Sequence, residues 1–128
     1  MSDPGLALQK ALYDKLSGSL SVPVFDSVPE KTPYPYVTLD YETADNASPI
    51  SGKKRENRLF YLSVWSDYKG QAQVKGINSE IAAALDEVKL LLSTGNAVSV
   101  RVIRTESRRD ADGVTYMGSV TLRIITQH

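Results

Sequence analysis

The sequence contains no cysteine and a single histidine, His128, which is its last residue. The lack of cysteine excludes disulfides, thiolate zinc sites and thiol nucleophiles, although it leaves the redox compartment undetermined. Acid–base catalysis near neutral pH most often uses histidine, and chain ends fray, so a histidine at this position is poorly suited to catalysis. We therefore expect His128 to be a solvated end or a tag remnant.

An excess of charge of one sign is also lacking, because 15 lysine and arginine residues balance 15 aspartate and glutamate residues. A neutral chain creates no global field that draws it to nucleic acid or to an anionic membrane. The N-terminus shows no basic segment followed by an apolar run, and no apolar stretch approaches the roughly 18 residues that span a bilayer. We expect a protein that stays soluble where it is made, with no membrane partner and no sequence-specific nucleic-acid partner.

Motifs for catalysis and cofactor binding are absent as well. There is no Gly-x-Ser-x-Gly sequence, and Gly70, Gly76 and Gly95 are too isolated to form a phosphate-binding loop. Asp110 and Asp112 flank a turn, but two acids without further ligands fall far short of a calcium-binding loop. We expect no catalytic residue, no metal and no cofactor, and hence no enzyme. A small enzyme or a nucleic-acid module stays as a rival interpretation.

Length and composition favour a single domain that spans residues 1–128. A chain of 128 residues, of which 41% are hydrophobic, buries roughly two thirds of the surface of its unfolded state. That is enough for a core without disulfides or metals. The composition is ordinary for a globular fold, and we find no internal repeat.

Two segments carry the helical period of apolar residues. The first begins at Asp3, whose carboxylate caps free N–H groups, and ends at Gly18, which readily adopts a left-handed conformation. The second begins within residues 67–70 and continues to about Leu91. The periodic positions are Leu8, Leu12 and Leu16 in the first segment and Val74, Ile77, Ile81, Leu85, Val88 and Leu92 in the second.

Alternating β-branched and aromatic residues predict strands. We expect them at residues 22–26, 36–43, 57–66, 97–109 and 114–127. The first is a short edge strand among prolines, and an Asp-Gly turn joins the last two. This order of elements predicts an α+β fold, with a mainly antiparallel sheet of four to five strands, two helices packed on one face and the other face partly open.

A long polar loop is expected at residues 44–56, because the segment is rich in Asp, Asn, Ser, Gly and Lys. A basic cluster of Lys53, Lys54, Arg55 and Arg58 lies at its end. The cluster is either a solvated loop that also contacts protein, a solvated loop alone, or a nucleic-acid contact. No aromatic residue between Glu42 and Phe60 offers a base a stacking surface, which disfavours the last interpretation.

Further candidate contacts lie on the expected strands. The strand at residues 57–66 is apolar on both sides, so its second side is either inside the core or covered by another subunit. Tyr61 and Trp65 lie on that second side, where interface anchors are expected. Arg101, Arg109 and Arg123 project from outer strand positions, either as exposed sheet residues or as specific contacts.

Five short segments, in order over nearly the whole chain, carry a family resemblance. They are Asp3-Pro4 with Leu8-Gln9-Lys10-Ala11-Leu12-Tyr13, Val24-Phe25-Asp26-Ser27-Val28-Pro29, Pro33-Tyr34-Pro35-Tyr36-Val37-Thr38-Leu39, Leu62-Ser63-Val64-Trp65-Ser66 and Arg109-Asp110-Ala111-Asp112-Gly113. Together they resemble the tail-completion, or tail terminator, proteins of long-tailed bacteriophages and of related gene transfer agents.

The resemblance implies a structural virion protein with a small α+β fold. Such proteins assemble as a six-fold ring on the end of the tail tube, stop its polymerisation and present a surface to the head connector. The implied partners are further copies of the chain, the tail tube protein and the head–tail connector protein. The implied location is the head–tail junction of a virion assembled in the host cytoplasm. The alternative is another head–tail connector or stopper, which docks on the portal side.

The resemblance supplies no catalytic residue. It implies that the loop at residues 44–58, which orders on assembly, and the exposed side of the sheet meet neighbouring subunits and the tube. Family members often have a glycine after the Pro-Tyr-Pro-Tyr strand, where this chain has Asp40. That departure leaves the exit angle of the loop open.

Overall fold

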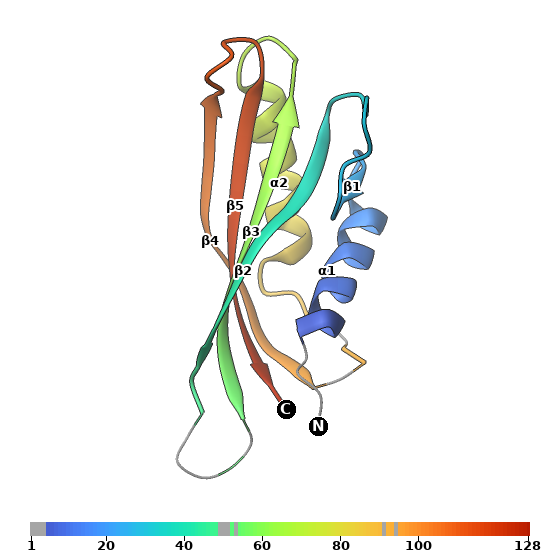
Figure 1. The fold of residues 1–128 in the computed structure, drawn as a ribbon. Coiled ribbons are helices and arrows are strands. Elements are labelled where there is room, and N and C mark those ends of the chain that lie inside the picture. The colour runs from blue at the N-terminus through green and yellow to red at the C-terminus, as the bar shows by residue number, and fades with distance from the viewer. Residues whose placement is uncertain (1–4, 49–51, 53, 91, 94) are drawn as a thin grey trace.

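The computed structural model describes residues 5–48, 52, 54–90, 92–93 and 95–128, and within them the chain forms two helices and five strands (Figure 1). The elements in chain order are α1 (Gly5–Ser19), β1 (Val24–Phe25), β2 (Tyr36–Asn46), β3 (Arg55–Ser66), α2 (Ala72–Leu85), β4 (Asn96–Arg109) and β5 (Tyr116–Gln127). The expected first residues of the first helix lie outside the described residues.

The strands form one sheet in the order β1-β2-β3-β5-β4. All neighbours are antiparallel except β1, which pairs in parallel with Val37 and Thr38 of β2. Both helices lie on the same side of the sheet, and the β2–β3 hairpin extends beyond them (Figure 1). The predicted α+β fold, with a mainly antiparallel sheet and two helices on one face, is confirmed.

One hydrophobic core fills the space between the helices and the sheet. Its fully buried side chains are Leu8, Leu12 and Leu16 of α1, Val74, Ile81 and Leu85 of α2, and Val37, Leu62, Val64, Val120, Leu122 and Ile124 of the sheet. The spacing of three or four residues in the helices and of two in the strands places each set on one face. Burial of these faces fixes which side of the sheet the helices cover.

Gly118 of β5 lets α2 approach the sheet closely. A Cβ atom at this position would lie 2.5 Å from Val74 Cγ1 and 2.7 Å from Asn78 Oδ1. Because real Cβ contacts are not this short, any other residue here forces the Val74 and Asn78 side chains of α2, or the helix itself, to shift.

The predicted end of the second helix at about Leu91 is wrong, since α2 ends at Leu85. Glu87 has a φ of 57°, and its N–H donates a hydrogen bond to the Val100 carbonyl at 2.9 Å. The Asp86 carboxylate accepts a hydrogen bond from the Val102 N–H at 3.0 Å. These bonds to the outer edge of β4 take the place of further helical turns. Val88, which continues the apolar period of the helix in the sequence, lies outside α2 and packs against the core.

The predicted loop at residues 44–56 is also shorter than expected. The β2–β3 ladder continues to the pair Asn46 and Glu56, and the Ala47 N–H donates to the Arg55 carbonyl at 2.9 Å. The connection is therefore reduced to residues within 47–54. Polar side chains in this part of the ladder pair with one another: the Arg58 guanidinium binds Glu42 of β2 and Glu56 of β3. Such pairs allow polar residues to form strand here.

Candidate functional site

The sheet has one face that neither helix covers, and we call it the open face (Figure 1). The strand register assigns to it Thr38, Asp40, Tyr41 and Asp45 of β2, Arg55, Leu59, Tyr61, Ser63 and Trp65 of β3, Met117, Thr121, Arg123 and Ile125 of β5, and Arg101, Arg104, Glu106 and Arg108 of β4. Tyr61 and Trp65 thus lie on the side that the sequence predicts for them.

Aromatic side chains pack along β2 and β3 on the open face. The rings of Tyr41 and Tyr61 lie 5.2 Å apart between centroids, and Tyr41 is 60% exposed. The indole N–H of Trp65 donates a hydrogen bond to the Thr38 hydroxyl at 3.2 Å. Trp65 is half-buried, so its ring is fixed in orientation while part of its surface faces solvent. Fixed, partly exposed aromatic rings are typical of interface anchors.

Asp40 is a candidate contact that the sequence did not identify. It lies at a β-bulge between Leu39 and Tyr41, inside β2 and not at the exit of a loop. Its Oδ1 accepts a hydrogen bond from the Thr38 hydroxyl at 2.6 Å, and its Oδ2 accepts one from the Ser63 hydroxyl. Both donors are neutral, and no lysine or arginine in the described part of the chain pairs with this exposed carboxylate. The bulge therefore holds an uncompensated negative charge in a fixed position.

Arginines gather on the β4 and β5 side of the open face. Arg101 and Arg123 are direct register partners, although like charges in this arrangement repel. Arg101 lies 3.5 Å from Asp86 and 4.0 Å from Glu87, and its side chain is 55% exposed. Contacts this exposed contribute about 0 to 1 kcal/mol each, so they neutralise Arg101 only in part.

Arg109 does not lie on the open face, which corrects its assignment to the same outer positions as Arg101 and Arg123. The bulge in β4 between Val102 and Arg104 lies between Arg101 and Arg109 and reverses the alternation of side chains. Arg109 consequently pairs with Tyr116, which packs against the core on the helix side. Its guanidinium lies 5.7 Å from the centroid of the Tyr116 ring.

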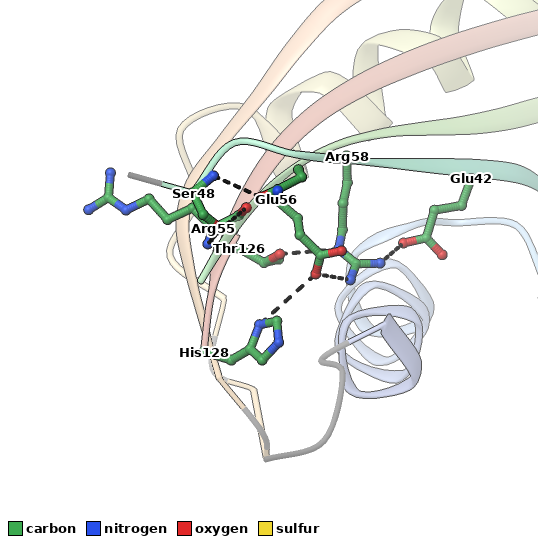
Figure 2. A network of polar contacts seen from close by, with 8 residues as sticks. Glu42, Ser48, Arg55, Glu56, Arg58, Thr126 and His128 are labelled. Carbon is green, nitrogen blue, oxygen red and sulfur yellow. Dashed lines mark hydrogen bonds and ion pairs between the residues drawn. The ribbon is translucent and has the colours of Figure 1, made fainter. Parts of the chain in front are cut away.

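Arg58 is buried, so the structure divides the predicted basic cluster. The Arg58 guanidinium contacts Glu42 at 2.7 Å, Glu56 at 2.8 Å and, through Nε, the Thr126 hydroxyl at 3.1 Å (Figure 2). Only 2% of the residue is exposed. Burial lowers the pKa of Arg58, but hydrogen bonds to the two carboxylates outweigh it and raise the pKa above its usual value. Arg58 is therefore a structural cation that no partner molecule reaches.

The other members of the cluster lie near the tip of the β2–β3 hairpin. Lys54 and Arg55 are exposed, and Arg55 Nε donates to Gln127 Oε1 at 2.8 Å. Lys53 lies outside the described residues. Lys54 and Arg55 lie beside the last residues of the chain, Gln127 and His128, which are distant from them in the sequence.

The prediction that His128 is a frayed, solvated end is wrong. Its N–H donates to the Lys54 carbonyl at 2.9 Å, and the Lys54 N–H donates back to the His128 carbonyl at 3.0 Å. The imidazole is only 10% exposed, and its Nδ1 lies 4.0 Å from Glu56 Oε1 (Figure 2). Two backbone hydrogen bonds that extend the β3–β5 ladder hold this residue, a tertiary effect invisible in the sequence.

A hollow of about 310 Å³ adjoins His128 and is lined by Asn46, Ser48, Lys54 and Glu56. Two of its groups are already engaged: Glu56 binds Arg58, and the Ser48 hydroxyl donates to the Arg55 carbonyl at 3.2 Å. Among the described residues, no three acidic, histidine or cysteine side chains are grouped as metal ligands. Neither described helix has the length and apolar character needed to cross a bilayer.

Comparison with known proteins gives one family and a shared fold. The family model described as "Tail completion protein gp17" matches residues 7–127. A chain from the solved "Virion of native gene transfer agent (GTA) particle" superposes with a TM-score of 0.87 at 23% identity, with 100% of both chains covered. A second solved chain gives a TM-score of 0.55 at 15% identity, covering 97% of this chain and 92% of its own. A search of the curated proteins finds no match.

Proposed function

Since the chain belongs to the tail completion protein gp17 family, we propose that it forms a ring on the end of a phage-type tail tube, ends the polymerisation of the tube and provides the head–tail joining surface. The family match over residues 7–127 is the observation that carries this proposal. A tail-associated structural role in a virion is the family's own. The ring, the capping and the joining surface are the parts that we add.

The open face supports assembly with other protein chains. It presents ordered aromatic side chains, of which Tyr41 is 60% exposed, together with charged side chains of both signs. Subunits of a ring meet through two different patches, so each copy must carry two distinct binding surfaces. A sheet with one face packed on helices and the other bearing aromatic rings and charges provides them without opening the core.

The expected partners are further copies of this chain, the tail tube protein and the head–tail connector protein. The similar chain in a gene transfer agent particle supports a virion location, and we place this protein at the head–tail junction of a particle assembled in the host cytoplasm. Its contribution is geometric: it binds and positions other proteins and carries out no chemical reaction.

The test is electron microscopy of tails assembled in cells that lack this protein. Capping predicts overlong tubes of variable length, which return to one length when the wild-type chain is supplied. Tails of normal length that fail to join heads would contradict capping and would favour the alternative, a connector or stopper that docks on the portal side. Tails of normal length that join heads normally would contradict both.

A further inference from the structure

The two outer long strands of the sheet carry opposite charge. β2 contains Asp40, Glu42 and Asp45 and no lysine or arginine, whereas β4 contains Arg101, Arg104, Arg108 and Arg109 with a single acid, Glu106. The strand order places β2 and β4 on opposite sides of the β3–β5 centre. One molecule therefore presents an acidic side and a basic side on the same sheet.

Contacts within the chain leave part of this charge uncompensated on the open face. Glu42 is occupied by Arg58, and Arg109 lies on the helix side. The acidic pair, Asp40 and Asp45, is exposed and forms no ion pair with the described residues. The arginine pair consists of Arg101, which is neutralised only in part, and Arg123. Within the same described part of the chain Arg123 has no ion pair.

The two pairs lie at the same level along the strands. The rung that contains Arg101 and Arg123 continues through Leu59 to Thr43 of β2. Thr43 lies between Asp40 and Asp45 in β2, so the acidic pair brackets the level of the arginine pair. A second copy displaced sideways, across the strands, therefore brings its arginine pair level with the acidic pair of the first.

Three backbone groups at the outer edge of β4 are already bonded to other elements, which favours a contact through side chains. Glu87 and Asp86 bond to Val100 and Val102, and Asn78 Nδ2 donates to the Glu106 carbonyl at 2.8 Å. A neighbouring strand cannot extend the sheet at this edge without displacing these bonds. The exposed arginine side chains are what this side of the sheet offers to another molecule.

We propose that the arginine pair of one copy binds the acidic pair of the next copy in a repeated head-to-tail contact. Arginine and carboxylate groups form charge-assisted hydrogen bonds of defined geometry, and the bulge at Asp40 presents its carboxylate in a fixed position. Because the two patches differ, the contact is heterologous and closes into a ring when the rotation between copies allows. The proposal deepens the proposed function and rests on its ring.

The test uses two charge reversals of the full chain. The variant D40K/D45K is basic on both sides, and R101E/R123E is acidic on both sides. We expect each variant alone to self-associate about tenfold more weakly than the wild type or worse. We expect an equimolar mixture of the two to assemble again, because alternating copies restore every contact. Sedimentation and native mass spectrometry at low and high salt measure both effects, and salt should weaken assembly.

A matched control separates this contact from general attraction between oppositely charged proteins. K15E/K69E changes the net charge as much as R101E/R123E does, at exposed lysines away from the open face. It should self-associate like the wild type, and it should fail to rescue D40K/D45K. D40N keeps one of the two acceptor oxygens of Asp40 while removing the charge, so weaker assembly by D40N with an unchanged melting temperature separates charge from folding.

Three results would overturn the proposal. The first is a wild-type chain that stays monomeric at every concentration. The second is assembly of D40K/D45K or R101E/R123E alone that equals that of the wild type. The third is a mixture of the two variants that fails to assemble. Binding of a single-stranded oligonucleotide that R101E/R123E abolishes would reassign the arginines to nucleic acid. The measurement of tail length is independent of this test. If D40K/D45K and R101E/R123E assemble like the wild type while the wild-type chain still caps tubes, the proposed function stands and the proposed contact is refuted.

Discussion

The indole N–H of Trp65 donates a hydrogen bond to the hydroxyl of Thr38 across the β2–β3 ladder, on the face that the helices leave uncovered. The bond fixes the ring while part of it stays accessible. We predict that Trp65→Ala impairs assembly on tail tubes more than it impairs folding of the monomer. Urea unfolding should show a loss well below that of Leu62→Ala, which empties a fully buried site and costs about 2 to 5 kcal/mol.

The Trp65 prediction has a clear opposite outcome. If Trp65→Ala unfolds as readily as Leu62→Ala, the indole is part of the core and not a contact. Trp65→Phe keeps an aromatic ring, although it loses the hydrogen bond and part of the ring area, so it should retain more assembly activity than Trp65→Ala.

The basic residues Lys53, Lys54 and Arg55, at the start of β3 and just before it in the sequence, are predicted to contact protein. Charge reversal at Lys53, Lys54 and Arg55 should leave the melting temperature within a few degrees of the wild type, because Lys54 and Arg55 are exposed and exposed charges contribute little to folding. It should block capping of tail tubes, measured as tube length in a complementation experiment. Normal capping by the triple variant would mean that the hairpin tip is only solvated.

Arg58, in contrast, is predicted to matter for folding. Arg58→Ala leaves Glu42 and Glu56 without their buried cation, which costs about 3 to 5 kcal/mol of unfolding free energy. Urea denaturation measures this loss. The matched variant E42Q/E56Q/R58M removes the charges together and should lose less than Arg58→Ala. An unchanged midpoint in Arg58→Ala would show that the network contributes nothing.

Gly118 is predicted to be intolerant of any side chain. Gly118→Ala places a methyl group against Val74 and Asn78, an overpacking that costs about 1 to 3 kcal/mol. Gly76→Ala is the matched control, because position 76 lies inside α2 with no atom within 4 Å of the added Cβ. Alanine there should stabilise the helix by about 0.5 to 1 kcal/mol. Equal effects at the two positions, by thermal unfolding, would refute the close approach of α2.

The turn between β4 and β5 is predicted to be sensitive to acid. The Asp112 carboxylate accepts hydrogen bonds from the Thr115 hydroxyl at 2.7 Å, the Thr115 N–H at 2.8 Å and the Val114 N–H at 2.9 Å, and these hold its pKa below 3.8. A depressed folded-state pKa contributes stability above the unfolded pKa and loses it as the pH falls through the folded value.

The acid sensitivity is measured against Asp112→Asn, which keeps one acceptor oxygen and cannot titrate. The difference in melting temperature between the wild type and this variant should be largest near neutral pH and should narrow below pH 3.8. A difference that stays constant with pH would show that the hydrogen bonds do not depend on ionisation.

The helices, the strands and the α+β class were predictable because they follow from the period of apolar residues. Leu8, Leu12 and Leu16 mark a helix face in the sequence as clearly as in the core. Periodicity cannot predict where a helix or strand ends when hydrogen bonds to another element cause the end. Asp86 and Glu87 end α2 by bonding to β4, although the apolar period continues past them.

The candidate site was predictable only in part. Alternation in β3 placed Tyr61 and Trp65 correctly, because that strand has no bulge. Alternation in β4 misplaced Arg109, because the bulge between Val102 and Arg104 reverses it and leaves no mark in the sequence. Arg58 looked like one exposed cation of a basic cluster, since its two glutamate partners approach it only through the strand register.

The most direct test of a capping ring is cryo-electron microscopy of the purified particle at the head-proximal end of its tail tube. The account predicts one closed ring of this chain on the last layer of tube subunits, with the arginine and acidic sides of adjacent copies in contact. A tube end that bears no copies of the chain, or copies bound only to the portal, would contradict it.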